Sequence, residues 1–287
     1  MEITSEIIKK LRDQTGAGMM DCKRALEATA GDMEKAVEFL RKKGAATAQK
    51  RADRSAKEGI IVTRVSTDAK IGVILEVNSE TDFVGRSNDF VGFAHSIAEV
   101  IQKQKPSHVE HLSTLSVGGK RIAELLNDLL AKVGEKIDIR RFKVMESSDG
   151  VVSSYTHLGS KIGVLVEISG LNAASAGTGV GRDIAMQIAA MNPGFITRDQ
   201  VDTTLVEREL DIYKTQAKNE GKPDKIVDKI ATGRLEKFYQ EVCLMEQTFI
   251  KDGTKTIKDY LQESAAAAGK PVVVRQFSRF HLGEEAK

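Results

Sequence analysis

The feature of this sequence that most constrains its fold is an internal repeat. Residues 59–63 (GIIVT) return as residues 150–154 (GVVSS), and residues 70–77 (KIGVILEV) return as residues 161–168 (KIGVLVEI). The separation is the same for both blocks, without a gap between them, which indicates a duplicated structural unit. Apolar runs of this length, rich in β-branched residues, are typical of strands that are buried on most of their surface.

A third pair of segments completes the two copies. Residues 137–142 correspond to residues 272–277 at a wider separation, so the second copy contains extra residues. The loop after the central strand does not repeat, because residues 81–84 (TDFV) stand where the second copy has residues 172–175 (NAAS). The scaffold is therefore duplicated and the tip is specialised. An aromatic residue, Phe83, at the tip of a loop between a strand and a helix is well placed to enter a partner.

Helices are predicted between the strands of each copy. In the first copy, apolar residues at spacings of three and four predict one helix over about residues 90–101, with Ser87 or Asn88 as its N-cap. A second helix is predicted over about residues 122–133 and ends at Gly134. Strands and helices in this order predict an α+β fold, in which each copy is a small antiparallel sheet with helices on one face.

The N-terminal residues predict a separate three-helix module. Glycines divide three short amphipathic helices, Asp32 is the predicted N-cap of the third helix, and Gly44 is predicted to end the set. Because a module this small is near the lower limit for independent folding, we expect it to serve as an interaction module. Lys23 on its middle helix fits either a partner contact or an ordinary solvated helix face.

The extra residues of the second copy predict a helical hairpin. Two amphipathic segments flank a break at residues 219–223 (NEGKP), and the hairpin is expected over about residues 194–238. It fits a solvated hairpin and a docking or oligomerisation arm equally well. The expected domains are a three-helix domain with a basic linker (residues 1–53) and two core subdomains (residues 54–146 and 147–287).

Composition argues against several classes of function. The net charge is +2, from 43 basic and 41 acidic residues, and this balance gives little reason to expect binding to a nucleic-acid backbone. Cys22 and Cys243 have neither metal-ligand spacing nor partners for a disulfide framework, so a reducing compartment is expected. No apolar run reaches the length of a membrane span and the N-terminus has no hydrophobic signal segment, which predicts a soluble, cytoplasmic protein.

Two patterns indicate other functions. Residues 177–181 (GTGVG) precede a predicted helix and would suit a dinucleotide-dependent enzyme, although the spacing is unusual and the preceding strand belongs to a hairpin. The basic stretch at residues 45–57 would suit an RNA-binding arm, although it contains no aromatic residue. The histidines form no metal-binding cluster, and no nucleophile stands at a recognisable spacing from a base. We therefore predict no catalytic residue, no metal site and no cofactor.

Several motifs together resemble one known family. Residues 15–26 (TGAGMMDCKRAL), residues 81–84 (TDFV), and residues 155–157 (YTH) ahead of residues 161–166 (KIGVLV) look like bacterial elongation factor Ts, in order through nearly the whole chain. This family promotes nucleotide exchange on elongation factor Tu, the GTPase that delivers aminoacyl-tRNA to the ribosome. The resemblance implies a ubiquitin-associated-like N-terminal domain, a core of two subdomains and a protruding coiled-coil hairpin.

The resemblance also implies roles for individual residues. It assigns the displacement of magnesium from the GTPase to the four residues of the loop tip: Thr81, Asp82, Phe83 and Val84. Phe83 would wedge between helices of the nucleotide-binding domain, with Asp82 making a polar contact beside it. Supporting contacts are expected from four further residues: Lys23, Val133, Gly134 and His157. Without the resemblance, His157 would be interpreted as a solvated residue at a hairpin tip.

The expected function is guanine-nucleotide exchange in translation elongation. The protein would bind elongation factor Tu with GDP, displace magnesium and promote GDP release so that GTP can bind. Because this requires no covalent chemistry, we do not expect an enzyme. The expected partner is the GTPase in its GDP-bound and nucleotide-free forms, with no direct contact to nucleic acid or membrane.

Two features of the resemblance leave the assembly open. Some relatives form a homodimer through the second subdomain, so both a one-to-one complex and a dimer of heterodimers fit the sequence. Some members continue past the last core strand with a further helical module that touches the GTPase, whereas this sequence ends at Lys287, which leaves that contact open.

Overall fold

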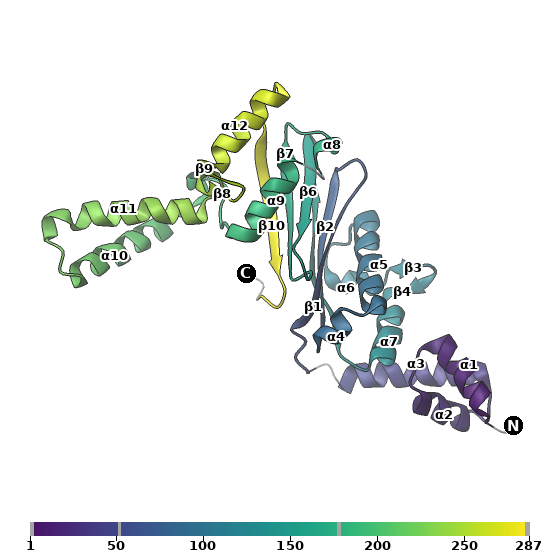
Figure 1. Cartoon of the computed structure of the whole chain (residues 1–287). Helices are drawn as coiled ribbons and strands as arrows, with labels where there is room; N and C mark the ends of the chain where they lie inside the picture. The colour runs from purple at the N-terminus through teal and green to yellow at the C-terminus, as the bar shows by residue number, and fades with distance from the viewer. Residues whose placement is uncertain (1–2, 51–52, 177–178, 285–287) are drawn as a thin grey trace.

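Two antiparallel sheets of three strands form the centre of the molecule (Figure 1). The computed structural model describes residues 3–50, 53–176 and 179–284. The six strands are β1 (Glu58–Val65), β2 (Ile71–Ser79), β5 (Ile137–Glu146), β6 (Gly150–Thr156), β7 (Ile162–Ser169) and β10 (Val273–His281). The strand orders are β1-β2-β5 and β10-β7-β6, so the apolar runs β2 and β7 are the central strands, as their near-complete burial requires.

The strand register confirms the duplication. Corresponding residues lie opposite one another in the two sheets: Leu75 and Phe142 in the first, Val166 and Phe277 in the second. The third strand of each sheet also carries a β-bulge at the same place, where Arg140 and Arg275 stand outside the pairing. The two copies therefore share not only their strand order but also a local irregularity.

The two sheets pack face to face. Ile61 of the first sheet and Val152 and Leu165 of the second belong to one buried cluster between them. Glycines allow this close approach, because a Cβ atom at Gly72 would lie 2.5 Å from Val152 Cγ1, and one at Gly163 would lie 2.5 Å from Ile61 Cγ2. The inner face of each sheet is thus covered by the other sheet.

Helices cover the outer face of each sheet (Figure 1). The helices are α5 (Asn88–Gln104) and α7 (Ile122–Val133) on the first sheet, and α9 (Val180–Met191) and α12 (Ile257–Ala268) on the second. Ser87 caps α5, since its Oγ accepts a hydrogen bond from the Phe90 backbone N at 3.4 Å. Gly134 ends α7 with a φ of 75°. The predicted α+β fold, with helices on one face of each sheet, is confirmed.

The N-terminal module consists of three helices, α1 (Ser5–Thr15), α2 (Met19–Ala28) and α3 (Met33–Lys50). Leu11, Cys22 and Leu26 are fully buried in its core. The prediction that Gly44 ends the third helix was wrong, because α3 continues to Lys50. Gly44 is buried where α3 crosses α7, and a Cβ atom there would lie 3.3 Å from Ala131 Cβ. Its function is close helix packing, which overrides the local preference of glycine for a helix end.

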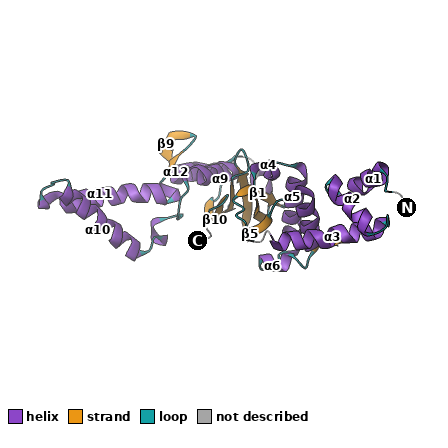
Figure 2. Cartoon of the chain, turned by 90° about the horizontal axis from the view of Figure 1, so that it is seen from below, coloured by secondary structure: helices purple, strands orange, loops and turns teal. Residues whose placement is uncertain are grey.

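The predicted helical hairpin is present as α10 (Thr203–Asn219) and α11 (Asp224–Val242). It extends away from the sheets, at the opposite end of the molecule from the three-helix module (Figures 1 and 2). Ion pairs cross between its two helices, Lys214 with Asp228 at 2.9 Å and Arg234 with Glu220 at 2.8 Å. Because these pairs are largely exposed, the contact between the two helices rests mainly on their buried apolar side chains, Ala217, Val227, Ala231 and Leu235.

Shorter elements complete the described residues: α4 (Asp82–Gly85), α6 (Val109–Leu112), β3 (Ser116–Val117), β4 (Lys120–Arg121), α8 (Ala173–Ala176), β8 (Thr248–Phe249), β9 (Asp252–Thr256) and the 3-10 turns Arg198–Gln200 and Leu244–Glu246. Residues 177–178 of the glycine-rich segment lie outside the described residues. Among the described helices, none combines the length and apolar character that a membrane span needs. The domain boundaries near residues 53 and 146 stay predictions.

Candidate functional site at one end of the double sheet

The specialised loop tip follows β2 and forms the short helix α4. Thr81 caps this helix, because its Oγ1 accepts a hydrogen bond from the Val84 backbone N at 3.4 Å. Val84 is half-buried and packs against the hydrophobic core of the first copy of the repeat. Phe83 points the other way and is 84% exposed. The tip therefore anchors one apolar side chain and presents the next one to solvent.

Asp82 adds a charge beside the exposed ring. Its carboxylate lies 2.9 Å from the Arg86 guanidinium, one helical turn along the chain. The aspartate side chain is 40% exposed and the arginine 76% exposed, so this pair is solvated and is worth little to stability. Asp82 is thus free to exchange Arg86 for a partner's polar group at small cost.

Two carboxylates fix the backbone of the tip. Glu135 accepts two hydrogen bonds from Thr81, at 2.9 Å from its backbone N and at 2.7 Å from its Oγ1. In the opposite direction, Glu80 accepts a hydrogen bond from the Lys136 backbone N at 2.7 Å. We call these crossed contacts between the two loops the carboxylate clasp (Glu80, Thr81, Glu135 and Lys136). Glu135 was not among the site residues predicted from the sequence, where its place after the helix-ending Gly134 was the only signal.

The clasp brings Val133 and Gly134 next to the tip. Both residues end α7 directly before Glu135, whose carboxylate holds Thr81. Val133 is half-buried against the core, and Gly134 is exposed with its backbone N donating to Leu130 O at 2.8 Å. The structure therefore unites these two predicted contact residues with the predicted loop tip.

The turn between β6 and β7 lies at the same end of the double sheet. Ser160 O accepts a hydrogen bond from Ile61 N at 2.6 Å, and Lys161 pairs with Glu58 at 2.9 Å. On its other side the start of β1 touches the tip, because a Cβ atom at Gly85 would lie 3.2 Å from Gly59 Cα. The first residues of β1 therefore separate α4 from the β6–β7 turn.

This turn exposes two side chains. His157 is exposed, and its Nδ1 shares a hydrogen bond of 2.9 Å with the Tyr155 hydroxyl. Leu158, next along the turn, is 91% exposed. His157 was a predicted site residue and Leu158 was not, since a single apolar residue at a hairpin tip belongs to no periodic pattern. Phe83 and Leu158 are the two most exposed large apolar side chains among the described residues, and both lie at this end. Both side chains are therefore candidates for contact with a partner protein.

Lys23 lies elsewhere. It is on α2 of the three-helix module, half-exposed, with its ammonium 3.9 Å from the Glu27 carboxylate. The module packs on α7 through α3, and α2 lies on its far side from α4 (Figure 1). The structure therefore does not bring Lys23 together with the loop tip.

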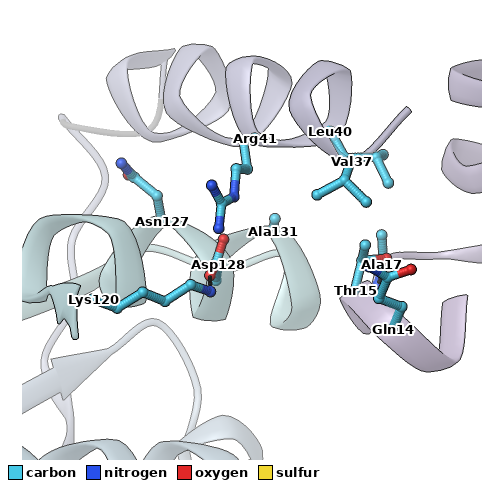
Figure 3. Close-up of a pocket in the computed structure, with 10 residues that line it drawn as sticks. All are labelled: Gln14, Thr15, Ala17, Val37, Leu40, Arg41, Lys120, Asn127, Asp128 and Ala131. Atoms are coloured by element: carbon cyan, nitrogen blue, oxygen red, sulfur yellow. Dashed lines mark hydrogen bonds and ion pairs between the residues drawn. The ribbon is translucent and has the colours of Figure 1, made fainter. Parts of the chain in front are cut away.

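A cavity between the three-helix module and α7 is separate from this surface (Figure 3). Its volume is about 190 Å³, and Lys120 on one wall pairs with Asp128 at 2.5 Å. Sites for cofactors and small substrates typically measure about 300–1,000 Å³. This cavity is therefore too small to indicate a nucleotide site. Among the described residues, no group of three or more His, Cys, Asp and Glu is arranged to hold a metal ion.

Comparison with known proteins identifies the family. A family model described as elongation factor TS matches residues 80–284, which include the loop tip and the whole second sheet. Elongation factor Ts of Chloroherpeton thalassium is 48% identical over 288 residues, covering 99% of both chains. Elongation factor Ts of Clostridium perfringens is 47% identical over 283 residues, covering 98% of this chain and 93% of the relative. That of Chlorobium phaeobacteroides is 45% identical over 286 residues. The chain therefore belongs to the elongation factor Ts family and has a role in translation elongation.

Proposed function

We propose that this protein is a guanine-nucleotide exchange factor for elongation factor Tu in the cytoplasm. It binds the GTPase with GDP, displaces the magnesium ion and promotes GDP release so that GTP can bind. One observation carries this proposal: Phe83 is 84% exposed at a tip whose backbone is held by hydrogen bonds. A rigid, exposed aromatic ring can enter a partner without first paying the entropy of ordering a loop.

The proposed mechanism is a wedge. In GTPases a magnesium ion binds phosphate oxygens of the nucleotide and is held by protein side chains. A side chain that shifts the elements around the metal weakens its coordination, because magnesium demands near-ideal octahedral geometry. We propose that Phe83 enters between helices of the nucleotide-binding domain while Asp82 makes a polar contact beside it. Loss of the metal then lowers the affinity for GDP without any covalent step.

The energetics of exchange are reciprocal. If this protein and GDP each bind the GTPase well but bind together poorly, each lowers the affinity of the GTPase for the other by the same factor. The protein therefore needs no catalytic residue, and the wedge acts only through binding free energy. This makes an exchange factor rather than an enzyme the proposed class.

The supporting contacts are proposed to spread over three parts of the chain. Val133 and Gly134 lie beside the tip, His157 lies on the β6–β7 turn at the same end, and Lys23 lies on the three-helix module. To these we add Leu158, which is 91% exposed next to His157. Contacts spread this widely fit a partner of several domains.

The test is the rate of GDP release from elongation factor Tu. The GTPase is loaded with fluorescent GDP in the presence of magnesium, and release into excess unlabelled GDP is followed by stopped-flow with and without this protein. The proposal predicts a rate that rises with the concentration of this protein and then saturates. Unchanged release at every concentration, under conditions where the two proteins form a complex, would overturn the proposal.

A further inference from the structure

The carboxylate clasp assigns a role to a residue that the proposed wedge does not itself use. We propose that Glu135 is a positioning residue for nucleotide exchange: it fixes Thr81 and thereby aims Phe83 at the partner. The inference rests on the proposed exchange function. Its structural part, that Glu135 orders the tip, can be tested on the protein alone.

All polar groups of Thr81 are occupied. Its backbone N and its hydroxyl donate to the two oxygens of Glu135, at 2.9 Å and 2.7 Å. The same hydroxyl accepts from Val84 N at 3.4 Å, and the Thr81 carbonyl accepts from Ser79 Oγ at 2.8 Å and from Gly85 N at 3.2 Å. These hydrogen bonds fix the conformation of Thr81, the N-cap of α4. Phe83 lies two positions further along this fixed backbone.

The carboxylate is the chemical group that these two donors require. An ionised glutamate offers two acceptor oxygens and no donor, so it can receive the N–H and the O–H of Thr81 at once. Hydrogen bonds to a charged acceptor are also shorter and stronger than neutral ones. A glutamine at position 135 has the same shape but would direct its NH₂ group toward one of the two donors. Glu135→Gln therefore removes half of the contact without creating a cavity.

The reciprocal contacts make the clasp rigid. Glu80 accepts a hydrogen bond from the Lys136 backbone N at 2.7 Å and forms an ion pair with Arg54 at 3.1 Å. Lys136 Nζ in turn donates a hydrogen bond to Arg54 O at 3.0 Å. Residues 80–81 and 135–136 are thus joined by contacts in both directions. One side of the clasp continues into β2 and the other follows α7, which is packed on the same sheet. The tip is therefore fastened to two elements of the core.

The duplication provides an internal comparison. By the strand register, Glu135 and Lys136 correspond to Lys270 and Pro271 of the second copy. A lysine there offers no acceptor and a proline offers no backbone N–H, so this part of the clasp cannot form in the second copy. The second copy also lacks the wedge, since its loop reads NAAS at residues 172–175. Clasp and wedge are thus present together in one copy and absent together from the other.

The first experiment uses the free protein. Hydrogen exchange of the Thr81 and Val84 amides is measured by NMR in the unsubstituted protein, in Glu135→Gln and in Glu135→Ala. Glu124→Gln is the matched control, because Glu124 lies on α7, the helix that precedes Glu135 in the chain, and its ion pair is with the exposed Arg121 at 3.2 Å. We expect protection of the Thr81 amide to fall at least tenfold in both Glu135 variants and to stay unchanged in the control. Unchanged protection in the Glu135 variants would overturn the clasp.

The second experiment is a double-mutant cycle on GDP release from elongation factor Tu. Glu135→Gln is expected to lower the maximal release rate at saturating concentration about threefold to tenfold, and to have no further effect in a Phe83→Ala background. Additive effects would show that Glu135 contacts the GTPase itself, and an unchanged rate in Glu135→Gln would show that order at the tip is irrelevant; either result overturns the positioning role. If elongation factor Tu releases GDP equally fast with Phe83→Ala and with the unsubstituted protein, the proposed wedge fails, while the hydrogen-exchange result on the clasp still stands.

Discussion

Glu76 is the buried carboxylate of the first sheet, and its replacement by glutamine is predicted to destabilise the protein far more than the same change in the second copy. Glu76 is completely buried, and it accepts hydrogen bonds from Arg141 Nε at 2.6 Å and from Gly283 N at 2.9 Å. Its counterpart in the second copy, Glu167, accepts a hydrogen bond from Gln276 Nε2 at 2.8 Å. The duplication thus places a charged partner in one sheet and a neutral partner in the other.

The structure gives the size of the effect. Arg141 is only 18% exposed, and removal of one partner of a buried ion pair costs about 3–5 kcal/mol. Arg141 keeps its contact with the Phe280 ring at 4.3 Å and its bond to His281 O at 3.1 Å. Because these contacts retain part of its stabilisation, we expect Glu76→Gln to cost about 2–3 kcal/mol. Glu167→Gln exchanges one amide–carboxylate bond for an amide–amide bond and should cost about 0.5–1.5 kcal/mol.

Urea unfolding of the two variants and the unsubstituted protein measures this difference. Glu76→Gln should lower the midpoint clearly more than Glu167→Gln, with an unchanged dependence on urea concentration. Equal losses in the two variants would refute the reasoning, because they would mean that the charge of Arg141 is irrelevant to the stability of the first sheet.

Three further predictions follow from packing, burial and exposure. Gly72→Ala should destabilise the protein by about 1–3 kcal/mol, because the new Cβ would overlap Val152. Gly92→Ala, on the open face of α5, should stabilise it by about 0.5–1 kcal/mol. A higher melting temperature for Gly72→Ala than for Gly92→Ala would contradict this. Burial raises the pKa of the Cys243 thiol to about 11, above the ordinary value of a free cysteine of about 9. The unfolded chain therefore loses this proton first, and stability should fall as pH rises from about 9 to 11. The effect should vanish in Cys243→Ala, and a fall of equal size in that variant would assign it to other groups. Leu158→Ser should weaken binding to elongation factor Tu about tenfold in titration calorimetry without changing the melting temperature, and unchanged affinity would remove the β6–β7 turn from the interface.

The fold was largely predictable because its signals are local or repeated. The identical spacing of two apolar blocks predicted the duplicated sheets, and Ser87 and Gly134 marked helix ends with side-chain and backbone chemistry that acts within one turn. Gly44 misled the prediction of α3, because its place in the helix depends on close packing against Ala131 of a distant helix. The preference of glycine for helix ends is overridden where close packing between helices requires a small residue.

The candidate site was predictable only in part. The loop tip stood out because the two copies differ there, and Phe83 is the aromatic residue at the difference. Glu135 could not be predicted as a site residue, because its partner Thr81 lies 54 positions away and each residue alone is an ordinary polar loop residue. Leu158 could not be predicted either, because a single apolar residue in a turn belongs to no periodic pattern. Contacts between distant loops and single exposed side chains need the three-dimensional arrangement.

The most direct test of the proposed wedge is the rate of GDP release from elongation factor Tu with Phe83→Ala at saturating concentration. Val273→Ala is the control, since Val273 is an exposed apolar residue on β10 at 40% exposure. Truncation of an aromatic anchor at an interface costs about 2 kcal/mol or more, so we predict release more than tenfold slower than with the unsubstituted protein, with the melting temperature unchanged and the control fully active. Release at the unsubstituted rate with Phe83→Ala would contradict the account.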